Sequence, residues 1–129
     1  MELLEDRVKR RREIFIWYKE NLANLPGLTV APATEPAGSR ANRWLTTVLL
    51  SPTESSTTPE HLRQHLEARK IESRPLWKPL HLQPLFAGVP MYGGAVCEDL
   101  FARGLCLPSG TALTDDDLRR IAKALREGL

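Results

Sequence analysis

An apolar repeat in the first 24 residues indicates that the chain begins with one long amphipathic helix. Large apolar side chains recur at spacings of three, four or seven residues, at Leu4, Val8, Phe15, Tyr18 and Leu22. These spacings place the side chains on one face of a helix. Pro26 and Gly27 are typical of a helix end. The sequence therefore predicts a helix over residues 2–24.

The beginning of this helix is unusual, because nothing precedes it that could cap its free N–H groups. The repeat is already present at Leu3, and no Ser, Thr, Asp or Asn stands ahead of it. A helix that begins uncapped at the initiator methionine suggests that the chain is a piece of a longer protein. Further apolar residues lie beside the main stripe, at Leu3, Ile14, Ile16 and Trp17. Because exposed apolar surface favours self-association, we expect a dimer formed through this helix.

Charge and hydropathy exclude several classes of protein. The chain of 129 residues has a formal net charge of +2, so it lacks the overall excess of positive charge that attracts nucleic acid. Its densest basic run, residues 9–13, falls on the predicted helix, where acidic residues one turn away favour a solvent-exposed surface. No apolar run approaches the length of a membrane span, and the start does not read as a secretory signal. We therefore expect a cytoplasmic protein that binds neither nucleic acid nor membrane.

The rest of the chain alternates between short strand-like segments and helices. β-Branched and large apolar residues indicate strands at 28–30, 43–51, 71–77 and 105–109. Helices are expected to follow Thr58 and Thr114, which are natural N-caps. A shorter helix is expected over 95–104, with Gly104 as a left-handed C-terminal cap. The pattern predicts the α+β class: a small three- to four-stranded, mainly antiparallel sheet covered by helices, preceded by the long N-terminal linking helix.

Two pairs of residues could carry thiol or metal chemistry, and neither pattern is complete. Cys97 and Cys106 lie among apolar neighbours in a chain without a recognisable export signal, so we expect reduced, buried thiols. His61 and His65 have the spacing of a two-histidine metal pair on a helix, yet no third ligand accompanies them. We interpret these histidines as an exposed polar face and expect no metal site.

The stretch "ESRPLWKPLHLQP", residues 72–84, combines side chains that can grip an anionic ligand in a segment that cannot be a helix. Arg74 offers a planar fork for phosphate or carboxylate, and Lys78 offers a mobile point charge. Trp77 can stack on a flat ring or a sugar face, and His81 is a donor or acid near neutral pH. The sequence therefore suggests a binding loop.

A purely structural role is equally compatible with the same residues. Trp77 would then belong to the core, Arg74 would pair with a carboxylate such as Glu72, and the prolines would only route the chain. From the residues alone, the binding and the structural interpretations of this stretch carry the same weight.

Four longer motifs make the chain resemble a known family. They are "NRWLTTVLL", "ESRPLWKPLHLQPLF", "YGGAVCEDLFARGLCLPSG" and "LTDDDLRRIAKALR". In this order and at these intervals, they resemble the C-terminal small domain of DegT/StrS-type nucleotide-sugar aminotransferases, which are pyridoxal-phosphate enzymes of fold-type I. The opening helix resembles the one that links the large domain of these enzymes to the small one. The resemblance implies a linking helix at residues 1–26 and the aminotransferase small domain at residues 27–129.

The resemblance also implies what this chain lacks. Family members form a Schiff base between pyridoxal phosphate and a lysine of the large domain, which lies upstream of the linking helix. None of the five lysines here matches that position: Lys9, Lys19, Lys70, Lys78 and Lys123. We therefore expect no catalytic residue and no cofactor-binding residue in this chain, no activity from it alone, and pyridoxal phosphate in the full-length enzyme.

For the complete enzyme, the resemblance implies transfer of an amino group from an amino acid, usually glutamate, to a keto carbon of a nucleotide-diphosphate sugar. Arg74 and Lys78 would meet pyrophosphate or the donor carboxylate, and Trp77 and His81 would meet the sugar or nucleotide, at or near a homodimer interface. An alternative of another class is a stand-alone module that binds a nucleotide sugar or a protein partner without catalysis.

Overall fold

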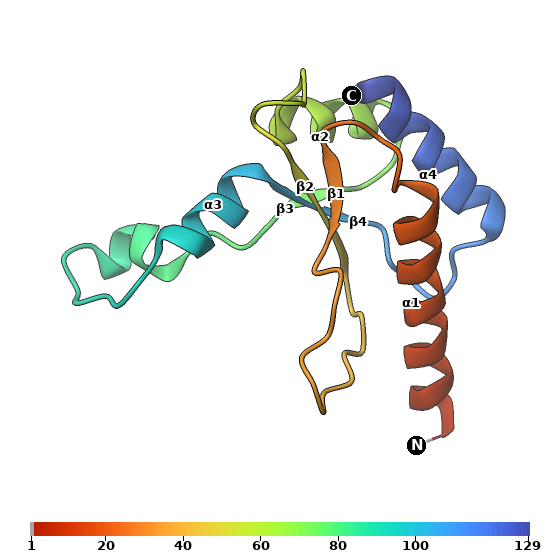
Figure 1. Cartoon of the computed structure of the whole chain (residues 1–129), viewed down its shortest axis with the longest axis horizontal. Coiled ribbons are helices and arrows are strands. Elements are labelled where there is room, and N and C mark those ends of the chain that lie inside the picture. The colour runs from red at the N-terminus through yellow and green to blue at the C-terminus, as the bar shows by residue number, and fades with distance from the viewer. Residues whose placement is uncertain (1) are drawn as a thin grey trace.

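The computed structural model describes residues 2–129, which form four α-helices, four strands and two short 3-10 turns (Figure 1). In chain order they are α1 (Glu2–Asn21), β1 (Leu28–Ala31), β2 (Thr46–Leu50), α2 (Pro59–Ala68), β3 (Arg74–Pro75), the 3-10 turns η1 (Leu80–Leu82) and η2 (Pro84–Phe86), α3 (Ala95–Arg103), β4 (Gly104–Leu107) and α4 (Asp115–Gly128). The strands form one antiparallel sheet in the order β1-β2-β4-β3. The predicted α+β class is confirmed. None of the helices in this range is long and apolar enough to span a membrane.

The sheet has two unlike faces. Val48 of β2 pairs with Val30 of β1 and Leu105 of β4, so these three side chains share one face, where they join the core with apolar residues of α1, α2 and α4. On the opposite face, Thr29 is exposed and Thr47 is half-buried. Figure 1 shows α1 and α4 on one side of the sheet and α3 projecting to the other side. The helices therefore cover one face and leave the other partly open.

Helix α1 packs on the core with its C-terminal half. The side chains buried on it or directly after it are Ile14, Phe15, Tyr18 and Leu22. Leu3 and Leu4 at its beginning are exposed. The helix ends at Asn21, three residues before its predicted end. Leu4 is thus not part of the buried stripe, whereas Ile14, which was predicted to lie beside the stripe, belongs to it.

The basic run of residues 9–13 is not simply the solvent-exposed surface that its charges suggest. The three arginines in it are half-buried. Arg10 pairs with Glu13 at 3.4 Å, as expected for charges one turn apart. Arg12, in contrast, pairs at 2.7 Å with Glu35 of the loop between β1 and β2. This part of α1 therefore contacts a distant loop as well as its own acidic residues.

The two predicted N-caps are confirmed, and the predicted left-handed C-cap is wrong. Thr58 Oγ1 accepts a hydrogen bond from the N–H of His61 at the start of α2. Thr114 and Asp117 form a reciprocal capping box on α4. Gly104 has an extended backbone with a φ of −101°, because β4 begins at this residue directly after α3.

Residues 76–103 form an arm that projects from the sheet between β3 and β4 (Figure 1). Leu85, Tyr92 and Val96 are among its exposed apolar side chains, and α3 has no buried residue. Cys97 on α3 is exposed too, which corrects the prediction of a buried thiol. The prediction fails because no layer of the described chain covers the outer side of the arm.

The junction between α1 and the sheet depends on a glycine. Gly27 has a φ of +72°, and a Cβ there would lie 2.7 Å from the backbone nitrogen of Ser55. Gly38 has a similar φ of +77° but nothing within 4 Å of a Cβ. We expect Gly38→Ala to lower the free energy of unfolding by about 1 kcal/mol through backbone strain alone, and Gly27→Ala to lower it clearly more. Urea unfolding of the two variants measures the difference, and equal losses would contradict the close contact with Ser55.

The capping box of α4 should make stability depend on acid pH. Hydrogen bonds from the Thr114 hydroxyl at 2.7 Å and the Thr114 N–H at 3.0 Å lower the pKa of Asp117. A carboxyl whose pKa is lower in the folded state stabilises the fold above its unfolded-state pKa of about 4, and this contribution disappears as pH falls through the folded-state pKa. We expect the stability difference between the wild type and Asp117→Asn to be largest near neutral pH and to shrink in acid.

Urea unfolding at a series of pH values from about 7 down to about 2 measures that difference. Asp116→Asn removes a charge from the same helix turn without touching the cap, so it is the matched control and should keep the acid-dependent loss due to Asp117. A difference for Asp117→Asn that stays constant with pH would rule out the cap as its source.

Candidate functional site

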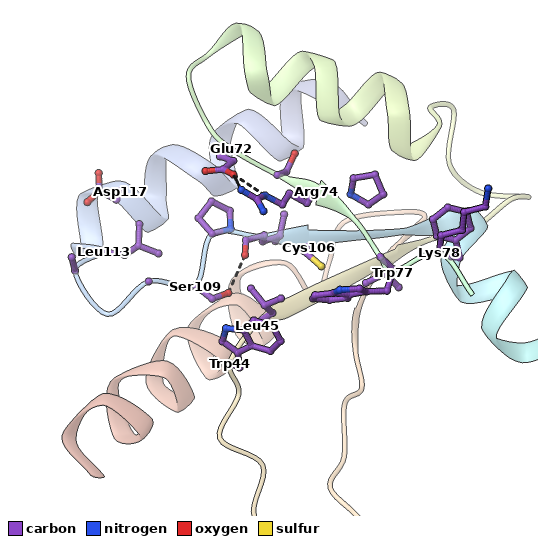
Figure 2. A pocket seen from close by; sticks show the side chains of 18 residues that line it. Trp44, Leu45, Glu72, Arg74, Trp77, Lys78, Cys106, Ser109, Leu113 and Asp117 are labelled. Atoms are coloured by element: carbon purple, nitrogen blue, oxygen red, sulfur yellow. Dashed lines mark hydrogen bonds and ion pairs between the residues drawn. The ribbon is translucent and has the colours of Figure 1, made fainter. Parts of the chain in front are cut away.

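A cavity of about 890 Å³ opens on the partly uncovered face of the sheet, beside the edge where β3 pairs with β4. Figure 2 shows Arg74 on one side of this cavity and Trp44 and Trp77 on the other, with Cys106 between them. Lys78 lies at one end of the lining. The cavity therefore gathers residues from the end of the β1–β2 loop, from β3 and the segment after it, and from β4.

Arg74 is placed by the two-residue pairing of β3 with β4. It lies opposite Cys106, which in turn lies opposite Thr47 of β2, so the three residues share one face of the sheet. Its Nε and Nη2 donate to Oε1 of Glu72 at 2.8 and 2.5 Å. Both side chains are exposed, so the pair contributes little stability, about 0–1 kcal/mol. The carboxylate partner that the structural interpretation requires is thus present, and Arg74 still lines the cavity.

Two tryptophans form an exposed aromatic wall. The ring centroids of Trp44 and Trp77 are 5.6 Å apart, with their planes inclined by 43°. Trp77 is 64% exposed, so it is not a core residue, and Trp44 is 58% exposed. Our sequence interpretation did not include Trp44 in the site. The signal that could have indicated it is its position, a large ring two residues before a buried strand.

Lys78 lines the cavity and His81 does not. The Lys78 side chain is exposed at the rim. His81 is directed toward the arm, where its Nε2 lies 2.8 Å from Oε1 of Glu98 on α3. The structure thus brings Arg74, Trp77 and Lys78 together around one cavity and places His81 outside it.

The floor of the cavity favours binding over covalent chemistry. Cys106 is buried there, and burial raises the pKa of its thiol. The hydroxyl of Ser109 accepts from the N–H of Thr46 at 2.8 Å and donates to the carbonyl of Leu107 at 3.0 Å, so it is committed to the backbone. No histidine is among the described residues that line the cavity, so the thiol has no base beside it. The arrangement can hold a flat ring at the tryptophans and an anion at the two cations.

The two helical histidines do not form a metal site. His61 is exposed, as predicted. His65 is half-buried against α4, with its Nε2 3.0 Å from the carbonyl oxygen of Ala124, so the prediction of an exposed face is wrong for this residue. Among the side chains that the structure describes, residues 3–129, no group of three or more His, Cys, Asp or Glu could hold a metal ion.

Comparison with known proteins identifies the family. The family model for the DegT/DnrJ/EryC1/StrS aminotransferases matches residues 1–126. The chain belongs to this family. The resemblance seen in its four motifs is thereby confirmed.

Two curated relatives show how much of such a protein the chain represents. It is 46% identical to EpsN of Bacillus subtilis (strain 168), whose name assigns it provisionally to the pyridoxal phosphate-dependent aminotransferases, over 97% of this chain and 32% of that protein. It is 31% identical to the GDP-perosamine synthase of Caulobacter vibrioides, over 100% of this chain and 34% of that enzyme. The chain spans about a third of the length of these relatives.

Solved structures of the family share the fold. The aminotransferase TlmJ from Streptoalloteichus hindustanus superposes with a TM-score of 0.82 at 28% identity, over 97% of this chain and 32% of that one. DesI, crystallised in the presence of its TDP-sugar product, gives a TM-score of 0.81 at 31% identity, over 95% of this chain and 31% of that one. The fold of this chain therefore corresponds to about a third of each enzyme.

The described residues do not fit a pyridoxal phosphate site. A Schiff-base lysine is held in an enclosed site whose other groups bind the phosphate and the ring. All five lysines of this chain are exposed. Lys19 donates to the carbonyl of Ala33, Lys123 lies 3.9 Å from a carboxylate oxygen of Glu127, and Lys78 stands at the cavity rim.

The two thiols should differ sharply in reactivity. Cys97 is exposed, whereas Cys106 is buried and the pKa of its thiol is raised. Because the thiolate is the nucleophile, we expect iodoacetamide to modify Cys97 quickly and Cys106 slowly. Timed labelling followed by peptide mass spectrometry measures both rates. In Cys97→Ser, only the slow reaction of Cys106 should remain. Equal rates would show that the cavity floor is open to the reagent.

Proposed function

We propose that this chain is the substrate-side domain of a sugar aminotransferase, which moves an amino group from an amino acid, usually glutamate, to a keto carbon of a nucleotide-diphosphate sugar. The observation that carries the proposal is the cavity where Arg74, Trp77 and Lys78 meet, in a chain of this aminotransferase family. The relatives named GDP-perosamine synthase, and DesI with its TDP-sugar product, support the same class of ligand.

Charge and shape support the roles of individual residues. Glu72 engages Nε and Nη2 of Arg74 through a single oxygen, and the remaining donors of the fork can bind diphosphate or the donor carboxylate. Lys78 adds a mobile positive charge at the rim. Trp77 offers a largely exposed ring to the sugar or nucleobase. His81 lies outside the cavity beside Glu98 of α3, and we assign to it a contact with the sugar or nucleotide from the arm.

We infer that the chain works within a larger, homodimeric assembly. It spans about a third of the length of its relatives and exposes apolar side chains both on α1 and on the arm, including Leu4 and Tyr92. In such an assembly, the loop of residues 72–84 lines the mouth of the active site, near the interface between subunits. Pyridoxal phosphate is held by other parts of the assembly, and the chain alone does not transaminate. We place the assembly in the cytoplasm, on the sequence prediction alone.

Nuclear magnetic resonance of the three indole N–H groups tests the assignment. We expect GDP-mannose, dTDP-glucose or UDP-N-acetylglucosamine to bind the chain weakly, on the order of 1 mM, because one side of the site is present. The signals of Trp44 and Trp77 should shift and that of Trp17 should not. Arg74→Ala should weaken binding about 10- to 100-fold, since a charge-assisted hydrogen bond to phosphate is lost.

Arg119→Ala is the matched control, because Arg119 is also exposed and paired with a carboxylate, Asp116 at 2.7 Å, but lies on α4 outside the cavity lining. Absence of any shift at high ligand concentration would contradict the assignment of Arg74 and Trp77. Sub-micromolar binding, on the other hand, would favour the stand-alone binding module. Turnover by the chain with added pyridoxal phosphate and glutamate would contradict its inactivity.

A further inference from the structure

Two arginines of α1 hold the loop that ends in Trp44. Arg11 Nη1 donates to the carbonyl oxygen of Trp44, and Arg12 Nη1 donates to that of Ala41 at 2.5 Å. Arg12 also pairs with Glu35 of the same loop at 2.7 Å. The loop backbone is therefore tied to the helix on both sides of residues 42 and 43.

Two further arginines of the same helix bond to the segment after β4, which also lines the cavity. Arg10 Nη2 donates to the carbonyl oxygen of Leu113 at 2.6 Å, and Arg7 Nη1 donates to Oγ1 of Thr111 at 3.5 Å. Leu113 lines the cavity, as Trp44 does. One helix thus connects two walls of the cavity that lie far apart in the sequence.

Arg43, directly before Trp44, is the buried charge of this loop, with 8% of the residue exposed. Its guanidinium carbon lies 3.8 Å from the centroid of the Phe15 ring on α1. Its Nε donates to Glu35 at 3.2 Å, and its Nη1 donates to the carbonyl of Pro32 at 3.0 Å. Its φ of +50° is left-handed, a conformation that costs about 1–2 kcal/mol for a residue with a Cβ. The side-chain contacts offset this strain and fix the direction in which the chain enters Trp44.

We propose that Arg11 and Arg43 are positioning residues, which hold Trp44 beside Trp77 and thereby keep the two rings together as one wall of the cavity. The ring of Trp44 is more than half exposed, so packing alone does not fix it. Arg11 acts on its backbone carbonyl, and Arg43 acts on the backbone conformation just before it. The described residues that line the cavity include both tryptophans and neither arginine, so the arginines act through Trp44.

The consequence for ligand binding rests on the proposed function. A flat ring held by both indoles gains contact with each only while their spacing is kept. Displacement of Trp44 would remove one aromatic contact, which corresponds to a two- to tenfold loss of affinity, about the value of one aromatic pair. The placement of Trp44 itself can be measured without any ligand.

Exciton coupling between the two indoles in circular dichroism measures that placement, because it depends steeply on ring separation and orientation. In a Trp17→Phe background, the remaining tryptophans are Trp44 and Trp77. Arg11→Met keeps an unbranched apolar stem and removes the donors, so we expect most of the couplet to disappear. Arg11→Lys can still donate and should retain it. Lys9→Met, an exposed position on the same helix, is the matched control and should leave the couplet unchanged.

Thermal unfolding of each variant separates misplacement of the ring from loss of the fold. If Arg11→Met does not fold, Arg43→Gly provides the same measurement, because glycine tolerates the φ of +50° but lacks the contacts that hold it. A couplet of wild-type size in either folded variant overturns the proposal. The two proposals can fail separately. If the variants lose the couplet but the wild type binds none of the three nucleotide sugars, the positioning role is supported and only the proposed function is contradicted.

Discussion

Burial of β4 on both faces is the constraint on which the rest of the structure depends. All four of its residues are buried, and it is hydrogen-bonded to β2 on one edge and β3 on the other. Leu105 and Leu107 belong to the core, and Cys106 lies in the cavity. Burying a large apolar side chain contributes about 1.5–3 kcal/mol, so the core face anchors this strand. The strand in turn fixes Arg74, which is attached to the sheet by a pairing of two residues.

Features that depend on neighbours in the sequence could be predicted from it, and features set by distant segments could not. Thr58 and Thr114 cap their helices because a side-chain oxygen reaches an N–H three residues ahead, whatever surrounds it. Gly104 has the sequence signal of a left-handed cap, but pairing with Leu49 of β2 imposes an extended backbone. Cys97 has apolar neighbours that predict burial, yet its helix lies on an arm that no layer of the described chain covers.

The candidate site also contains residues that could be predicted from the sequence and residues that could not. Arg74, Trp77 and Lys78 could be grouped from the sequence because they lie within five residues of one another in a segment that prolines keep out of a helix. The position of Trp44 just before a buried strand marks it as a candidate, but its place beside them depends on the pairing of that strand and on bonds from α1. The arginines of residues 9–13 donate partly to backbone carbonyls, which are present at every position and leave no complementary charge in the sequence. The pattern of charges in the sequence therefore cannot predict which arginines hold a distant loop.

The alternation along β4 also limits how this cavity can change during evolution. A larger side chain at Cys106 would press on a strand whose residues on either side, Leu105 and Leu107, are close-packed in the core. The loops that carry Trp44 and Leu113 tolerate change more readily, because they lie at the surface. Differences in ligand preference between related proteins are therefore expected to arise mainly at the rim, in the loops that carry Trp44 and Leu113. The floor at Cys106 is expected to change as slowly as the core beneath it.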